Sequence, residues 1–251
     1  MSETAPYMKI RTSERSDGSK WRTYETPNSI FVLTGVGRSL ILEDGLYTKL
    51  QAYSQDLIEN DTDTQEPKTR NFLAAGGNAK VFSVGDTQLA IKEARMSTDE
   101  LSPDQLLPAL ERMDRLVYAI EKNCPRWIDI PQHYGVLIPK KNPLQQFMLM
   151  QKIDSGITVT DILSAGSKNE RTEHYLNPCS LVSFGPIDST TKSEIKKLYE
   201  EMLVKVRNSL MLEYMSPDEY LPDIKNQDNV LVERLQNPIA GKMFKLWIID
   251  Q

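Results

Sequence analysis

Short apolar runs separated by turn residues dominate the first part of the chain. The runs SIFVLT (29–34) and SLILED (39–44) flank a VGR turn and predict a hairpin. Four apolar residues then recur at helical spacing and predict a helix: Leu46, Leu50, Tyr53 and Leu57. The segment 59–70 is uniformly polar, contains a proline and has no period, so it predicts a linker with a boundary near residue 66.

Longer strands are predicted beyond that boundary. FLAAGGNAKVFSV (72–84) reads as two strands around a small-residue turn. Further strands are predicted at QLAIKEA (88–94), HYGVLIP (133–139) and QQFMLMQKI (145–153). A helix is predicted over 106–123, and its buried face is marked by Leu110, Met113, Val117 and Ile120.

The last third of the chain is predicted to be mainly helical. A long helix is expected over 191–212, where Thr191 and Glu194 form a T-x-x-E capping box. Its apolar stripe consists of Ile195, Leu198, Met202, Val206 and Leu210. Two short strands are expected at 229–233 and 244–250, joined by a loop that contains Asn237, Pro238 and Gly241.

Composition and charge exclude several classes of protein. The net charge of −5 opposes binding to nucleic acid, which needs clustered basic residues. No apolar run approaches the roughly 20 residues that span a bilayer, so a soluble protein without a membrane span is expected. Cys124 and Cys179 lie far apart and are expected to be reduced, while His133 and His174 have no ligand-spaced neighbours and receive no role.

The candidate chemistry begins at the turn AAGGNA (74–79). Small residues there let the backbone approach a ligand closely. Ile91 follows ten residues after Val81, and Lys92 comes next in an otherwise apolar strand. Together the two strings resemble, in order and approximate spacing, the glycine-rich loop and the V-A-I-K strand of protein kinases.

The resemblance to kinases implies a set of nucleotide contacts. Lys92 would contact the α and β phosphates, and a helix glutamate would orient it. Glu111 is the expected glutamate, with Glu121 or Glu100 as alternatives if the helix register differs. Met148 or Met150 would guard the adenine pocket. The implied nucleotide-binding residues are Ala75, Gly76, Gly77, Asn78, Lys92, Gln151, Lys152 and Ile153.

The string YLPDIKNQDNVLVE (220–233) resembles the kinase catalytic loop and the strand after it. Asp223 would then act on the acceptor hydroxyl. Asn229 falls six residues later, where the family usually has five, so Asp228 is an alternative ligand of magnesium. Asp250, at the end of WIID, would be the second metal ligand, like the aspartate of D-F-G.

The string GGNAKVF in particular looks like the glycine-rich loop of short bacterial effector kinases of the OspG and NleH group. The resemblance implies an α+β, two-lobed fold. Its antiparallel-sheet N-lobe would cover 67–152 and its reduced helical C-lobe 153–251, after an N-terminal extension over 1–66. Leu221 and Pro222 replace the family's histidine and arginine. Only Gln251 follows Asp250, so two interpretations are expected: a truncated chain or a minimal kinase.

The resemblance implies an ATP- and Mg²⁺-dependent phosphotransferase, an atypical serine/threonine protein kinase. Its substrate would be a protein, a host protein included, and an activating partner is compatible with so small a C-lobe. Two alternatives stay open: a pseudokinase or binding module that uses 1–66 or 165–189 as contact surface, and a kinase-fold enzyme that transfers AMP or another group. The compartment stays open between the cytoplasm and delivery into a host cell.

Overall fold

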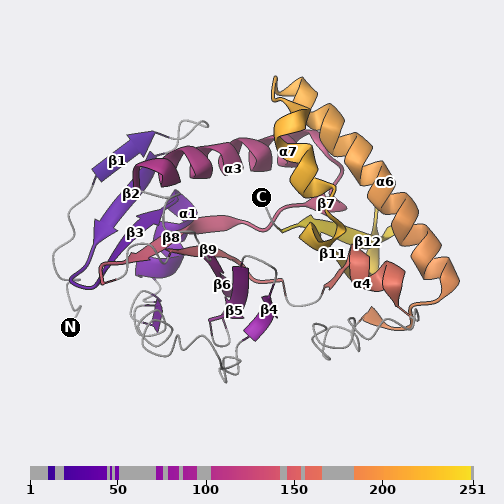
Figure 1. Cartoon of the computed structure of the whole chain (residues 1–251), viewed down its shortest axis with the longest axis horizontal. Helices are drawn as coiled ribbons and strands as arrows, with labels where there is room; N and C mark the ends of the chain where they lie inside the picture. Colours follow the sequence, from indigo (N-terminus) through magenta and orange to yellow (C-terminus); the bar gives the residue numbers. More distant parts are fainter. Residues whose placement is uncertain are drawn as a thin grey trace. The chain divides into compact units, whose positions relative to one another are not determined.

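The structure is a computed structural model, labelled in Figure 1. It describes residues 11–14, 20–43, 46, 49–50, 72–75, 79–84, 87–94, 103–141, 146–153, 156–165 and 184–249. The predictions for Tyr53, Leu57 and 59–70 lie outside this part of the chain. The chain divides into two compact units: Met1–Glu111 with Gln132–Lys152, and Arg112–Pro131 with Ile153–Gln251.

The first unit contains an eight-stranded sheet in the order β1-β2-β3-β8-β9-β6-β5-β4, with every neighbouring pair antiparallel. The strands are β1 Arg11–Glu14, β2 Lys20–Glu25, β3 Ser29–Leu33, β4 Phe72–Ala75, β5 Ala79–Ser83, β6 Leu89–Ala94, β8 His133–Pro139 and β9 Gln146–Gln151. The predicted strands over 72–94, 133–139 and 145–153 are thus confirmed in their described parts. Strands from both ends of the unit's sequence join one sheet.

The predicted hairpin over 29–44 is wrong. Residues 29–33 form β3, but Gly35–Arg38 form helix α1 and Ser39–Glu43 continue as the π-helix η1. Thr34 starts the helix, because its Oγ1 accepts a hydrogen bond from the Gly37 N–H at 2.9 Å and donates one to the Tyr134 carbonyl at 3.2 Å. Strand β3 pairs with β2 and β8 instead.

Helix α3, Pro103–Asn123, confirms the predicted helix and begins three residues earlier. Of its predicted buried face, Met113 and Ile120 are buried and Val117 is partly buried. The boundary between the two units falls within this helix, between Glu111 and Arg112. The carboxyl-terminal half of α3 therefore belongs to the second unit.

The second unit combines helices with a four-stranded sheet in the order β10-β11-β12-β7, in which only β12 and β7 run parallel. Its strands are β7 Ile128–Asp129, β10 Ile157–Thr158, β11 Val230–Ile239 and β12 Lys242–Ile248. Its helices besides α3 are α4 Val159–Ser164, α6 Ser189–Leu212, α7 Pro217–Ile224 and the 3-10 helix η3 Gln227–Asn229. The chain is therefore of the α+β class.

Helix α6 buries the whole stripe predicted for it, from Ile195 to Leu210. Its predicted capping box is wrong, however. The helix begins at Ser189, and the carboxylate of Asp188 accepts a hydrogen bond from the Thr191 N–H at 2.7 Å. Thr191 therefore lies in the first turn of the helix, where an N-cap is no longer needed.

The loop predicted between the last two strands is also wrong. Strands β11 and β12 extend to a two-residue turn in which Ala240 and Gly241 have φ angles of 50° and 76°. Positive φ at both central positions is the mark of a type I′ hairpin turn. Asn237 and Pro238 lie inside β11, where the pairing register with β12 shifts between Arg234 and Ile239.

We expect the substitution Ala240→Asn to stabilise the second unit by roughly 1 kcal/mol, because asparagine tolerates the left-handed region that strains alanine. Thermal unfolding followed by circular dichroism would measure the change. Gly241→Ala, which has no atom within 4 Å of its added Cβ but a φ of 76°, should shift the midpoint the other way. A lower midpoint for Ala240→Asn would contradict the turn assignment.

None of the helices in the described part of the chain is long and apolar enough to cross a membrane.

Candidate functional site

Lys92 lies in β6, between the hairpin β4–β5 and strand β9. Its Cα is opposite Val81 on one side and Met148 on the other. The side chain is partly buried. The predicted small-residue turn joins β4 and β5, where Ala75 pairs with Lys80, whereas Gly76, Gly77 and Asn78 lie outside the described residues.

His133, to which the sequence assigned no role, is the first residue of β8. The charge of Lys92 acts on its imidazole. Burial disfavours the imidazolium and the Lys92 ammonium adds to this, so the pKa of His133 falls to about 4. Its Nδ1 is buried and has no hydrogen-bond partner within the described part of the chain. The environment of Lys92 therefore includes a neutral histidine that no spacing rule pointed to.

The predicted adenine-contacting segment begins at Gln151, the last residue of β9. Gln151 donates its backbone N–H to the Gln132 carbonyl at 2.8 Å, and Lys152 donates to the Gln88 carbonyl at 2.8 Å. Gln151, Lys152 and Ile153 are all partly buried. Of the two methionines proposed to guard the pocket, Met150 is buried and Met148 is partly buried.

Glu111, the predicted partner of Lys92, is partly buried on α3. Its carboxylate forms no ion pair or hydrogen bond in the part of the chain that is described. Glu121 is exposed, and Glu100 lies outside the described residues.

Asp114, which the sequence analysis missed, is the only charged side chain among the buried residues described, with 7% of its surface exposed. A carboxylate is rarely so buried without a partner, and Asp114 does have one.

Asp223, Asp228 and Asn229 are brought together by the turn from α7 through η3 into β11. Asn229 closes this turn, because its Nδ2 donates to the Asp223 carbonyl at 3.0 Å. Asn226 supports it by accepting from the Asp228 N–H at 3.2 Å. Asp223 and Asp228 are exposed and Asn229 is partly buried. The Asn229 Oδ1 accepts a long hydrogen bond from Asn226 Nδ2 at 3.5 Å. An amide oxygen has two lone pairs, so one remains for a hard cation, which prefers oxygen ligands.

The end of β12 lies beside the same turn. The Ile249 N–H donates to the Asn229 carbonyl at 2.9 Å. Asp250 is the next residue in the chain, and the prediction made for it lies outside the described residues. The last described residue of the chain is thus hydrogen-bonded to a predicted metal ligand.

Asp161 in α4 also faces this turn, although the sequence analysis did not single it out. Burial is the main reason that its pKa is raised, and the charge of Asp228 raises it further. The Thr158 hydroxyl, which donates to Asp161 Oδ2 at 2.6 Å, acts in the opposite direction. The spacing T-x-x-D from Thr158 to Asp161 is a capping pattern that would have marked the start of α4.

The turn can present carboxylate and carboxamide oxygens from successive residues, which is the donor set that Mg²⁺ prefers. Within the described ranges, no group of three or more His, Cys, Asp or Glu side chains gathers in a way that could hold a metal. The metal ligands predicted from the sequence therefore reduce, in this part of the chain, to Asn229 and Asp228.

The chain matches no model of a protein family, no curated protein and no solved structure.

Proposed function

We propose that the chain is an ATP- and Mg²⁺-dependent phosphotransferase of the protein-kinase type, acting on serine or threonine hydroxyls of a protein. The observation that carries this proposal is the arrangement around Lys92. A small-residue hairpin, a lysine strand, a helix and two antiparallel strands follow one another in the chain, and β6 lies between the hairpin and β9. Kinases place their phosphate-binding lysine on such a strand, before a helix that carries the orienting glutamate.

The turn in the second unit supports the same proposal. It follows a helix and leads into β11, and the neighbouring strand β12 ends at Ile248, two positions before Asp250 in the sequence. In this reading Asp223 accepts a hydrogen bond from the substrate hydroxyl and so directs its oxygen at the γ phosphate. Asn229 or Asp228, with Asp250, would hold Mg²⁺, which neutralises phosphate charge when bound.

The remaining residues would bind and orient the nucleotide. The backbone of 75–78 would cover the phosphates, Lys92 would contact them, and Glu111 would orient Lys92. The backbone at Gln151, Lys152 and Ile153 would meet the adenine ring. Catalysis would then arise mainly from positioning and from electrostatic stabilisation.

The test compares nucleotide binding with phosphoryl transfer. ATP binding would be measured by calorimetry with and without Mg²⁺, and transfer by incorporation of labelled γ phosphate into the chain itself and into protein acceptors. Lys92→Ala is expected to weaken binding at least about tenfold, because a buried phosphate contact is lost. Lys141→Ala, which removes an exposed lysine of the same unit, should leave binding unchanged.

Asp223→Asn is expected to retain binding but to lower transfer by about 100-fold or more, since its carboxylate acts on the acceptor rather than on ATP. Asp218→Asn, on the exposed first turn of the same helix, is the matched control. Transfer that survives in both Lys92→Ala and Asp223→Asn would rule out the proposed site.

A pseudokinase is the second candidate, and the state of Glu111 favours it. Active kinases need the lysine–glutamate pair in place, whereas Glu111 forms no ion pair in the described structure. Nucleotide binding without transfer to any acceptor would favour this function over the enzyme.

A further inference from the structure

Helix α3 carries Glu111 in the first unit, but the residues directly after Glu111 pack into the second. Leu116, Ala119 and Ile120 are almost completely buried in the hydrophobic core that also contains α6 and α7. Packing of this kind resists separation of helices but allows small sliding of one packed helix along another. Polar contacts are what fix such a helix in one rotation.

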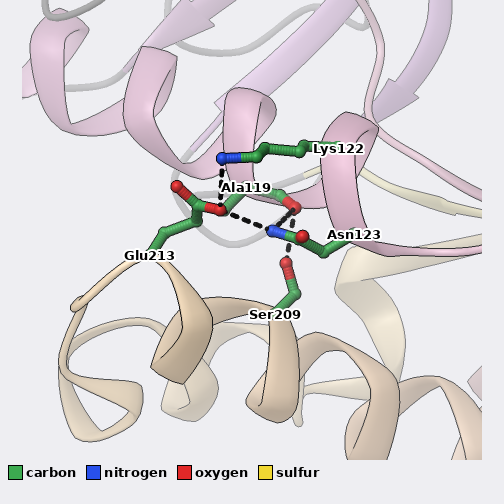
Figure 2. A network of polar contacts seen from close by, with 5 residues as sticks. All are labelled: Ala119, Lys122, Asn123, Ser209 and Glu213. Atoms are coloured by element: carbon green, nitrogen blue, oxygen red, sulfur yellow. Dashed lines mark hydrogen bonds and ion pairs between the residues drawn. The ribbon is translucent and has the colours of Figure 1, made fainter.

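Such contacts gather where α3 meets the end of α6 (Figure 2). Glu213 Oε1 accepts from Asn123 Nδ2 at 2.9 Å and forms an ion pair with Lys122 Nζ at 3.0 Å. The Ser209 hydroxyl, which is buried, donates to the Ala119 carbonyl. One carboxylate thus binds two consecutive residues of α3, and a hydroxyl one turn away along α6 binds the α3 backbone.

A second contact lies at the other end of the same stretch. Arg112, the residue after Glu111, forms an ion pair with Glu219 of α7 at 3.7 Å. Both side chains are about half exposed, so this pair is weak. Glu213 and Glu219 nevertheless belong to one short corner of the chain, and they hold α3 at points ten residues apart.

We infer that Ser209, Glu213 and Glu219 form a brace that joins residues 112–123 of α3 to the end of α6 and to α7 within the second unit, with Glu213 as the principal positioning residue. This inference rests on the proposed function. The part of α3 that follows Glu111 is then fixed, within the second unit, to the helix that carries Asp223. Kinases are controlled in part by the position of that helix, and the brace holds its carboxyl-terminal part in one position within the second unit.

The charge of Glu213 is suited to this role. Hydrogen bonding from Asn123, and then from Lys122, lowers the pKa of Glu213 below its usual value. Because the folded pKa lies below the unfolded one, the contribution of Glu213 to stability is fully present above pH 4.5 and is lost as the pH falls through the folded pKa. At neutral pH the brace is therefore charged and complete.

Hydrogen exchange measured by mass spectrometry tests the brace without relying on activity. Glu213→Ala is expected to raise exchange in residues 112–123 by about tenfold, because a charge-assisted pair of hydrogen bonds is lost. Glu213→Gln keeps an oxygen for Asn123 and should give a smaller increase. Glu200→Ala, on the exposed face of α6, is the matched control and should change nothing there. Equal exchange in Glu213→Ala and Glu200→Ala would overturn the brace.

The positioning role has a separate readout in the phosphotransfer assay. Glu213→Ala is expected to lower kcat by about tenfold with little change in the KM for ATP, and Glu213→Gln should restore part of kcat. A change in KM alone, or an unchanged kcat, would overturn that role. If the unaltered chain transfers no phosphate while exchange in 112–123 responds as expected, the proposed function fails and the brace stands as a structural element.

Discussion

Gly37→Ala is expected to destabilise the first unit by about 3 kcal/mol, because helix α1 lies against strand β8 with no room for a side chain. A Cβ added at Gly37 would lie 1.9 Å from the Tyr134 carbonyl oxygen and 2.7 Å from its carbonyl carbon. Both contacts are with backbone, so relief requires a shift of α1 or β8. That shift would also strain the Thr34 hydroxyl, which bonds both elements.

Gly35→Ala supplies the matched control on the same short helix, since nothing lies within 4 Å of the Cβ it would add. We expect it to change the free energy of unfolding by no more than about 0.5 kcal/mol. Urea unfolding of both variants would measure the difference. Equal midpoints would mean that α1 does not pack on β8 as described.

Phe147→Ala is expected to cost about 3–5 kcal/mol of stability, which is typical of a large aromatic residue removed from a closed core. Phe147 is fully buried in β9, in the apolar cluster of the first unit with Ile91, Leu137 and Leu149. Met202→Ala, in α6 of the second unit, is the counterpart, with an expected loss of about 2–5 kcal/mol.

Hydrogen exchange resolved by peptide would locate each loss. Phe147→Ala should lower protection mainly in β3, β6, β8 and β9, whereas Met202→Ala should act mainly on α6, α7 and β11. Such a split would mean that the two cores unfold as separate cooperative units. A uniform loss throughout the chain in both variants would instead mean a single cooperative unit.

Much of the fold could be predicted because patterns within short stretches of sequence determine most of its helices and strands. The strands β5, β6, β8 and β9 are short apolar runs between turn residues, and α3 and α6 repeat apolar positions at helical spacing. The wrong predictions concern segments whose structure depends on contacts between residues far apart in the sequence, or on a turn without its usual sequence signal. Thr34, which caps the helix that begins at Gly35, bonds to Tyr134, a hundred positions away. The Ala240–Gly241 turn lacks the Asn-Gly or Asp-Gly signal that usually marks such hairpins.

The candidate site divides in the same way. Asp223, Asp228 and Asn229 are close in the sequence, so their grouping could be predicted. The structure places all three in one turn, which the Asn229 side chain closes. The surroundings of His133, Asp114 and Asp161 could not be predicted, because burial and the charges of residues remote in sequence set them. Lys92 lies on the predicted strand, whereas the predicted partner Glu111 forms no ion pair among the described residues.

The division of α3 between the two units has a consequence for synthesis on the ribosome. The apolar face formed by Leu116, Ala119 and Ile120 emerges long before Leu210, at the far end of the helix that shares its core. At ordinary elongation speeds this delay is roughly 5–20 seconds. During that time the nascent chain lacks the α6 residues that complete this hydrophobic core, so we expect translation pauses or chaperone binding to affect the yield of folded protein.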